Sequence, residues 1–468
     1  MPSKGVECYS YIGAPGYTID FAVPKGGFTA SSGNNFRSHD LEIDAKALKL
    51  FEATGRFQWT VKKDGQAIEG RYAEISPYDG NVHSGNMSKI MDEKSVIHGD
   101  SIITYGFYGA GPGVAGLTNK HQCYVTVSPN YSSWMGTLAP VASGQASRPF
   151  STFVLPAPHD CGMNNMDTIS SIMNAPNGSK IRDALLGRLG IIKDLEAVAV
   201  EAAKNIAPNI MLSLAMTEKD SISTLLALGA RYFEFRPAYM HDDIRSLCPN
   251  PNTLYFQHAC IPGLAYVDFL REIVSFLDTY PTEIVVIHLR WDGVLPGCAK
   301  PSADELSRTI TSVTSGSRTG VKAGDRTCLN RQISDLRSSG QRIIIVQMDA
   351  TYSSYDDAAY ATLIPDPIVS RLRGMNTSGQ AGNDFTLLQC QGTASSIEKV
   401  WHYSIVASNT SDSCLLETKA KFDTATLPWV RDNALNVLRA EQTIVVMNDF
   451  LDGATTDVVI GLNRERFR

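Results

Sequence analysis

The first 140 residues alternate apolar and polar positions at the period of β-strands. The run Phe57-Gln58-Trp59-Thr60-Val61 places every second side chain on one face, and it leads through an Asp-Gly pair into another polar strand. Asp-Gly is a strong hairpin signal. Residues 101–108 and 122–127 repeat the alternation, whereas 41–54 favours a short helix. The pattern predicts a small β-sandwich over residues 1–140.

From residue 149 onward the pattern changes to apolar runs that alternate with segments of helical period. Residues 284–287 are all apolar, as expected for a parallel strand buried on both faces. Repeated βα units favour a TIM-type (β/α) barrel over two doubly wound halves. An eighth strand is not visible, which leaves open a distorted or incomplete barrel. The predicted strands are 153–155, 231–235, 254–257, 284–289, 342–348, 385–390 and 443–447; the helical segments are 181–206, 221–228, 266–279, 303–311 and 429–440.

Length and local composition divide the chain. At 468 residues one core is unusual, because most domains have about 100–200 residues. Residues 132–148 are rich in Ser, Gly, Pro and Ala, which is typical of a connection between domains. The sequence therefore predicts an accessory β-domain at 1–140, a linker at 141–148 and an α/β domain at 149–468.

Composition excludes several classes of protein. Hydrophobic residues make up 43% and charged residues 19%, and the net charge is −6. A negative balance argues against nucleic-acid binding, because phosphate contacts need a basic face. The sequence has no apolar run of about 18 residues that would span a bilayer. It also has no Gly-x-Gly-x-x-Gly or phosphate loop, so a nucleotide-binding fold has no support.

Cysteines and the amino terminus bear on location. The nine cysteines are scattered without C-x-x-C pairs, which argues against a zinc ribbon and a full disulfide framework. Residues 1–8 contain no hydrophobic signal region. We expect a cytoplasmic or peripheral membrane protein. The alternative is a secreted protein whose leader is absent from this chain, and sequons such as those at Asn86 and Asn409 allow it.

The first candidate catalytic residues follow the first predicted strand of the α/β region. The apolar run 153–155 leads into Pro156 and Pro158, and His159 and Asp160 follow at once. Because proline cannot continue a sheet ladder, we expect the strand to stop just before the His-Asp pair. A titratable pair at the end of a strand is where barrel enzymes place their chemistry.

Other predicted strands end in similar residues. Glu234 and Arg236 are two positions apart, so both point to the same face, and Phe233 and Phe235 face the helices. An inward Glu-x-Arg pair needs partners, since buried charges are costly. Further polar residues at strand ends are His258, Arg290, Asp292 and Asp449.

These residue types together suit one reaction class. Two histidines supply a general base and a general acid near neutral pH, and carboxylates orient each imidazole. An arginine binds a phosphate and stabilises the negative charge that develops on it. The combination predicts phosphodiester cleavage by acid–base catalysis, with no metal and no cofactor.

Each residue also has an ordinary structural interpretation. A single histidine is often a satisfied core residue, and Glu234 with Arg236 can be an ion pair that closes the barrel bottom. Asp449 can cap the last helix, which is predicted to start at Ala454. What favours the catalytic interpretation is the common placement at the carboxyl ends of separate strands.

The same residues carry a resemblance to a family. The run 155–161, Leu-Pro-Ala-Pro-His-Asp-Cys, resembles the Pro-Gly-Thr-His-Asp-Ser motif of phosphatidylinositol-specific phospholipase C X domains. The run 229–236 is similar to that family's Gly-x-Arg-x-x-Asp-x-Arg, with Glu234 in place of the aspartate. The resemblance continues through the second-histidine strand, the Pro-x-Glu strand and the closing Asp strand at 255–258, 280–286 and 446–450, and covers about residues 149–468.

The resemblance implies a (β/α) barrel and cleavage in two steps. The inositol 2-hydroxyl attacks phosphorus and releases diacylglycerol and a cyclic inositol phosphate, which is then hydrolysed slowly. It implies that His159 is the base, supported by Asp449, and that His258 protonates the leaving oxygen with Asp160 nearby. Arg236 holds the phosphate, as in the metal-independent bacterial branch of the family. By position, Glu234, Arg290 and Asp292 are expected to contact substrate.

Two alternatives remain. One is a metal-dependent phosphodiesterase of the glycerophosphodiester or sphingomyelinase D kind, in which His241-Asp242-Asp243 add ligands to Glu234 and His258. The other is a lipid- or glycan-binding protein on a degenerate barrel.

The expected partner is a phospholipid head group at a membrane surface, and residues 1–140 are a candidate glycan- or lipid-binding module. Met163, Met166 and Met173, and the run 401–403, suit an apolar rim or buried core.

Overall fold

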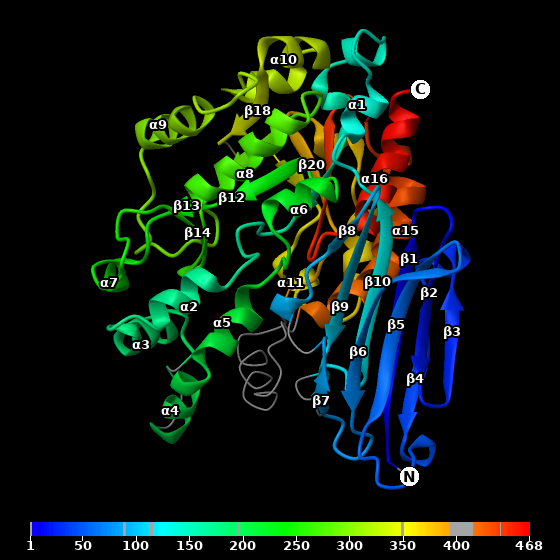
Figure 1. Cartoon of the computed structure of the whole chain (residues 1–468). Helices are drawn as coiled ribbons and strands as arrows, with labels where there is room; N and C mark the ends of the chain where they lie inside the picture. The colour runs from blue at the N-terminus through cyan, green and yellow to red at the C-terminus, as the bar shows by residue number, and fades with distance from the viewer. Residues whose placement is uncertain are drawn as a thin grey trace.

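The computed structural model describes residues 2–87, 90–111, 116–191, 193, 197–347, 351–393, 415–439 and 441–468. Its amino-terminal part contains two five-stranded sheets, at the right of Figure 1. One sheet has the order β4-β1-β10-β9-β8, and the other has the order β3-β2-β5-β6-β7. The strands are β1 (Ser3–Ile12), β2 (Tyr17–Val23), β3 (Gly26–Ala30), β4 (Ser38–Asp44), β5 (Gly55–Lys63), β6 (Gln66–Ile75), β7 (Val82–Gly85), β8 (Val96–His98), β9 (Ser101–Tyr108) and β10 (His121–Pro129).

Both sheets contribute buried side chains to one hydrophobic cluster. Phe57 and Trp59 enter it from β5, and Phe107 and Val125 enter it from β9 and β10. The helix predicted over 41–54 is wrong. Leu41 and Ile43 are buried at a period of two in β4, which pairs with β1, and only a short 3-10 turn follows at Ala45–Ala47.

Parallel strands dominate the carboxyl-terminal part. One sheet has the order β11-β21-β20-β19 and another has the order β12-β16-β18-β17. All seven predicted strands exist, although Met348, the predicted end of one, lies outside the described residues. The bounds are β11 (Val154–Pro158), β12 (Tyr232–Phe235), β16 (Val285–Leu289), β17 (Lys322–Gly324), β18 (Gln341–Val346), β19 (Thr351–Ser353), β20 (Phe385–Gln389) and β21 (Thr443–Asn448).

The molecule is therefore a mixed α/β protein with several sheets. The two parallel sheets approach each other where β11 and β12 are neighbours, and the Arg231 amide donates to the Pro156 carbonyl there at 3.0 Å. Among the described strands no ladder joins the sheets into a closed barrel.

The strand that carries the second histidine differs from the prediction. β14 (Tyr255–His258) is antiparallel to β13 (Pro237–Ala238) and β15 (Ile261–Ala265) in a separate three-stranded sheet. It is thus not one of the parallel strands. The chain extends beyond β12 into β13, and the Gln257 amide donates to the Arg236 carbonyl at 3.1 Å. This pairing, rather than a barrel ladder, brings His258 to the end of β12.

β11 ends at Pro158, immediately before His159, but both prolines lie inside the strand. Pro156 and Pro158 are two residues apart, so their missing amide donors fall on one side. That side faces β12, since the Pro156 carbonyl accepts from Arg231. The other side pairs with β21 in regular parallel register. The prolines therefore weaken the contact with β12 and leave the contact with β21 intact.

Helices pack around the sheets of the carboxyl-terminal part (Figure 1). Phe233 and Phe235 of β12 pack against Phe269 of α8, as their alternation with Glu234 predicts. The helices are α1 (Trp134–Leu138), α2 (Asp167–Met173), α3 (Gly178–Arg188), α4 (Ala197–Asn205), α5 (Ala207–Ala215), α6 (Ile222–Ala227), α7 (Asp242–Arg245), α8 (Tyr266–Thr279), α9 (Ala303–Thr314), α10 (Ile333–Ser339), α11 (Asp357–Tyr360), α12 (Asp366–Arg373), α13 (Thr377–Gln380), α15 (Leu416–Val437) and α16 (Gly453–Arg466).

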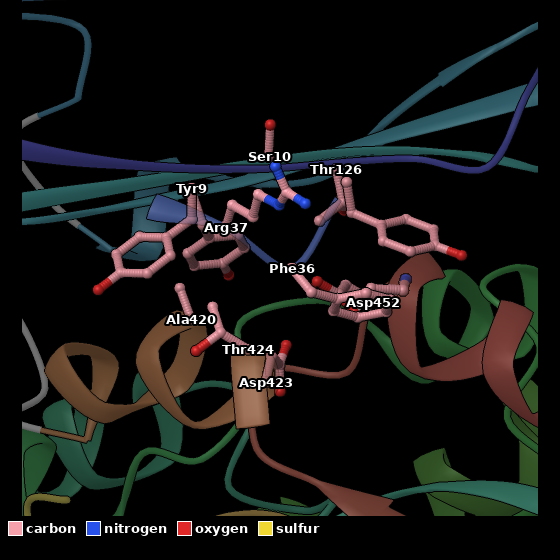
Figure 2. A pocket seen from close by; sticks show the side chains of 12 residues that line it. Tyr9, Ser10, Phe36, Arg37, Thr126, Ala420, Asp423, Thr424 and Asp452 are labelled. Atoms are coloured by element: carbon pink, nitrogen blue, oxygen red, sulfur yellow. Dashed lines mark hydrogen bonds between the residues drawn. The ribbon is translucent and has the colours of Figure 1, made fainter. Parts of the chain in front are cut away.

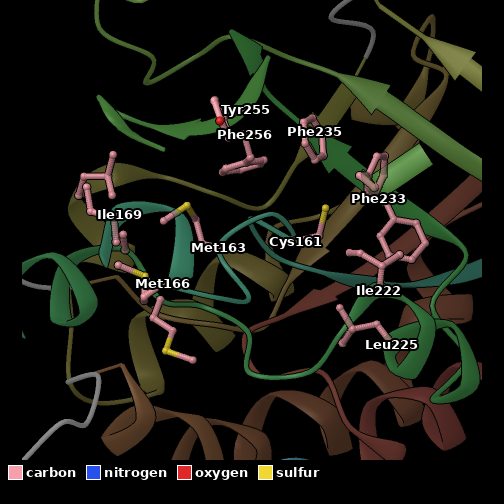
Figure 3. Close-up of a cluster of buried hydrophobic side chains, with 14 of the residues drawn as sticks. Cys161, Met163, Met166, Ile169, Ile222, Leu225, Phe233, Phe235, Tyr255 and Phe256 are labelled. Atoms are coloured by element: carbon pink, nitrogen blue, oxygen red, sulfur yellow. The ribbon is translucent and has the colours of Figure 1, made fainter. Parts of the chain in front are cut away.

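The methionines that follow the His-Asp pair are core residues. Met163, Met166 and Met173 are buried in the largest hydrophobic cluster, and Figure 3 shows Met163 near Phe256 of β14. They form no exposed rim, and the run 401–403 lies outside the described residues. Among the described helices, none has the length and apolarity needed to cross a membrane. The eight described cysteines are free and buried.

Candidate active site

The first part of the site joins the ends of β11 and β21. The two strands are parallel, and Pro158 lies opposite Asn448, so the next residues of each strand are neighbours. The His159 amide donates to the Asn448 carbonyl at 2.9 Å. The imidazole Nδ1 of His159 lies 2.8 Å from Oδ1 of Asp449. This carboxylate holds the ring so that Nε2 is left for another partner.

The second part of the site centres on Asp160. One carboxylate oxygen lies 2.9 Å from Nδ1 of His258, and the other lies 2.8 Å from Nη2 of Arg236. The Asp160 carboxylate is almost completely buried, whereas the side chains of His258 and Arg236 are 32% and 11% exposed. Asp160 thus fixes a histidine and an arginine, and parts of both remain accessible from solvent.

The predicted substrate-binding residues surround Arg236. Nη2 of Arg236 lies 3.2 Å from Oε1 of Glu234, and Nη1 of Arg290 lies 3.4 Å from the other Glu234 oxygen. Arg290 also makes a two-point contact with Asp292, with distances of 2.8 and 2.9 Å. The side chain of Asp292 is half exposed. Carboxylates and guanidinium groups therefore alternate from Asp160 out to the surface.

The residue that follows each of His159, His258 and Asp449 has an unusual backbone conformation. Asp160, Ala259 and Phe450 have φ values of 43°, 54° and 46°, in the left-handed region that residues other than glycine rarely adopt. They are the second residue of the His-Asp pair and the residues after His258 and Asp449. Such strain persists only where surrounding contacts impose it, and it gathers at functional sites.

The charges of the site shift several pKa values. Burial disfavours the charged form of the His159 imidazole, but Asp160 and Asp449 outweigh it and raise its pKa to about 9. Burial raises the pKa of Asp160, but Arg236 and the two histidines outweigh burial and hold this pKa well below the ordinary value. Burial raises the pKa of Glu234 and of Asp449. Despite burial, Asp160 and Glu234 raise the pKa of Arg236.

Some of these groups have metal-ligand geometry. His159, Asp160 and Glu234 offer ligand atoms within 4.8 Å of one another. The Nη2 atom of Arg236, however, lies 2.8 Å from Asp160 and 3.2 Å from Glu234. A guanidinium in contact with both carboxylates takes their lone pairs and repels a cation. These residues do not fit a metal ion as they are arranged.

The other proposed metal ligands have structural partners. The side chain of His241 accepts from the Asp243 amide at the start of α7, and the Asp243 carboxylate pairs with Arg188 at 2.5 Å. Asp449 does not cap the last helix. Asp452 does, since its side chain accepts from the amides of Ala454 and Thr455.

The sequence does not predict two further contacts at the site. Thr217, between α5 and α6, donates its hydroxyl to the carbonyls of His159 and Asp160 at 2.9 and 3.2 Å. The thiol of Cys161 donates to the Glu234 carbonyl at 3.0 Å. Thr217 lies in a connection without strand or helix period, and although Cys161 follows the His-Asp pair, its sequence position does not indicate which carbonyl its thiol contacts.

We compared the chain with known proteins. No family model and no curated protein matches it. Among the solved structures that it resembles are bacterial phosphatidylinositol-specific phospholipases C. The enzyme from Listeria monocytogenes has 14% sequence identity and a TM-score of 0.42, over 71% of this chain and 98% of that chain. A structure of the Staphylococcus aureus enzyme with incorporated pentafluorophenylalanine has 11% identity and a TM-score of 0.41, over 71% of this chain and 97% of that chain.

Proposed function

We propose that this protein is a phosphodiesterase that cleaves a phosphatidylinositol-type phospholipid by acid–base catalysis without a metal. One observation carries the proposal: two histidines, each with Nδ1 on a carboxylate, lie on either side of one buried aspartate that also holds an arginine. This arrangement offers two Nε2 atoms for proton transfer and a guanidinium for a phosphate.

The roles are those that the family resemblance implies, and the carboxylate partner of each histidine supports them. His159, held by Asp449, takes the proton of the inositol 2-hydroxyl as that oxygen attacks phosphorus. His258, held by Asp160, gives a proton to the diacylglycerol oxygen as the bond to phosphorus breaks. Arg236 stabilises the charge on the phosphate oxygens. The products are diacylglycerol and a cyclic inositol phosphate, and a water molecule in place of the leaving alcohol allows slow hydrolysis of the latter.

The raised pKa of His159 sets a condition on this mechanism. With a pKa of about 9, the imidazole is mostly protonated at neutral pH. The base form is then a minority species, and its share rises tenfold per pH unit up to that value.

The surroundings of the site suggest how a head group binds. Glu234, Arg290 and Asp292 extend the charged surface outward from Arg236, and they offer both donors and acceptors to inositol hydroxyls. The substrate is part of a lipid bilayer, so we propose peripheral attachment to a membrane surface. Residues 149–468 would form the catalytic unit, a distorted (β/α) barrel, behind an amino-terminal β-sandwich at 1–140.

The experiment that tests the proposal is a turnover assay on phosphatidylinositol vesicles with His159→Ala and His258→Ala. We expect each substitution to lower kcat by about 10³-fold or more, because each removes one proton-transfer group. His241→Ala serves as the matched control, since this histidine caps α7, and its kcat should equal that of the wild type. Near-full activity of either His159→Ala or His258→Ala would refute the assignment.

A further inference from the structure

The segment Thr217–Asp220 joins α5 to α6 and consists of four polar or charged residues. All four are almost completely buried, at 1% or 2% exposure. Buried polar and charged side chains are costly unless each has partners. The partners of this segment lie at both of its ends, at the candidate active site and in the amino-terminal sheets.

At one end, Thr217 holds the two strained loops of the site. Its hydroxyl donates to the carbonyls of His159 and Asp160, and its carbonyl accepts from the Phe450 amide at 2.7 Å. Asp160 and Phe450 are two of the residues with left-handed backbone. Glu218 adds to this, because its carboxylate accepts from the Leu451 amide at 3.0 Å. One threonine therefore contacts the loops that carry both His159 and its partner Asp449.

At the other end, the segment is held by the chain between η3 (Ile90–Asp92) and β9. The Asp220 carboxylate accepts from the amide of Ser95 at 2.8 Å and from its hydroxyl at 2.6 Å. Lys219 donates to the Glu93 carbonyl at 2.6 Å and pairs with Asp220 at 3.0 Å. Residues 93–95 thus give hydrogen bonds to both charges in addition to the Lys219–Asp220 pair.

A second contact between the same parts of the molecule bypasses the site. Tyr11 of β1 donates to Asp457 of α16 at 2.5 Å. It lines a small cavity between β1, β10, α15 and the start of α16, seen in Figure 2. This contact also docks the amino-terminal sheets on the α/β part, but it touches neither loop.

We propose that Thr217 is a positioning residue for His159 and Asp449, and that the amino-terminal sheets hold it in place through Ser95 and Asp220. Residues 1–140 then support the active site in the catalytic unit and are not only a separate binding module. The catalytic part of this proposal rests on the function proposed above.

The first test compares Thr217→Val, which removes the hydroxyl at constant size, with Thr217→Ser, which keeps it. We expect Thr217→Val to lower kcat by about 10- to 100-fold with KM within about twofold, because a small misplacement of a base is costly. Thr217→Ser should retain kcat within about threefold. Ser95→Ala should lower kcat by a smaller factor, about three- to tenfold, and Tyr11→Phe should leave it unchanged.

The second test does not depend on turnover. The imidazole of His159 faces Asp160, Asp449 and Glu234, and its titration is followed by NMR in the full-length protein labelled with ¹⁵N-histidine. The signal is assigned by its loss in His159→Gln. In Thr217→Val the pKa of His159 should fall from about 9 toward the ordinary value, and in Tyr11→Phe it should not move.

An unchanged pKa of His159 in Thr217→Val would refute the positioning role. An unchanged kcat in Ser95→Ala, with a lowered kcat in Thr217→Val, would refute the part assigned to the amino-terminal sheets. If Tyr11→Phe lowers kcat as much as Ser95→Ala does, the loss reflects general docking of the amino-terminal sheets, and the specific role of Ser95 and Asp220 is refuted. If the wild type does not turn over phosphatidylinositol, the proposed substrate fails while the titration still decides the role of Thr217.

Discussion

Two arginines stand at opposite ends of β12, and they differ in how their donors are used. Arg231 directly precedes the strand, and Arg236 directly follows it. Arg231 is completely buried and donates to Glu283 at 2.7 and 3.0 Å and to four backbone carbonyls. Arg236 contacts Asp160 and Glu234, yet its buried Nε has no partner in the described part of the chain.

The comparison separates a structural ion pair from a functional one. The sequence leaves open that Glu234 and Arg236 close the barrel bottom. The buried structural pair at this strand is Arg231 with Glu283, at the other end of β12, and each nitrogen of the Arg231 guanidinium donates at least once. An arginine that leaves a donor unpaired beside two histidines supports the proposal that Arg236 binds an anion.

The largest effect on kcat/KM is expected at Arg236, the arginine that follows β12. Arg236→Ala should lower kcat/KM for phosphatidylinositol on the order of 10⁴-fold, since no other group replaces the charge on the phosphate. The free energy of unfolding, measured by urea denaturation, should fall by less than the ~3–5 kcal/mol typical of a broken buried pair, because His258 still contacts Asp160 and the shortened side chain lets water reach this carboxylate. A large loss of stability with normal kcat/KM would make Arg236 a structural residue.

Arg231→Met should have the opposite signature. It leaves the buried Glu283 without its partner, so the free energy of unfolding should fall by about 3–5 kcal/mol. The kcat per folded molecule should be unchanged. The double variant Arg231→Met/Glu283→Leu is the control, because removal of both charges should recover most of the stability. A fall in kcat per folded molecule would contradict the separation of the two ends.

The pH dependence sharpens the roles of the histidines. His159 has its pKa raised to about 9, so its base form increases as pH rises and is complete only above that value. If His159 is the base, the residual kcat/KM of His258→Ala, which has no general acid left to titrate, should increase about 50-fold from pH ~7 to pH ~9 and level off above that value. A kcat/KM that decreases through this range would instead make His159 the general acid.

The smallest effect is expected at the exposed edge of the site. Asp292 pairs with Arg290, but its side chain is half exposed, and exposed ion pairs contribute little. Asp292→Asn should therefore change kcat/KM by only about two- to fivefold, mostly through KM. Asp432→Asn, at an exposed two-point contact with Arg431 that is outside the site, is a matched control. A loss comparable to that of Arg236→Ala would place Asp292 at the reacting phosphate.

Much of the site is predictable from strand ends. His159 and Asp449 are 290 residues apart in the sequence, yet both follow apolar runs that form adjacent parallel strands. Parallel strands bring their carboxyl ends to one edge, which is why the pairing follows from the pattern. The same-face placement of Glu234 and Arg236 follows from the period of two.

Other parts of the site have no such signal. The pattern of residues 254–257 predicts one more parallel strand, but β14 is antiparallel to its neighbours. The prediction fails because periodicity does not indicate the direction of a strand. Thr217 and Asp220 lie in a short connection without period, and their partners are 57 and 125 residues away. Contacts of this kind depend on how segments far apart in the sequence pack together, which no local pattern encodes.

The most direct test of the account is phosphorus NMR of phosphatidylinositol vesicles incubated with the protein in excess EDTA. We expect a cyclic inositol phosphate resonance to appear at the rate seen without the chelator, and to be absent with Arg236→Ala. Turnover that stops in EDTA and returns with a divalent cation would contradict the central claim that Arg236 and two histidines carry the reaction without a metal.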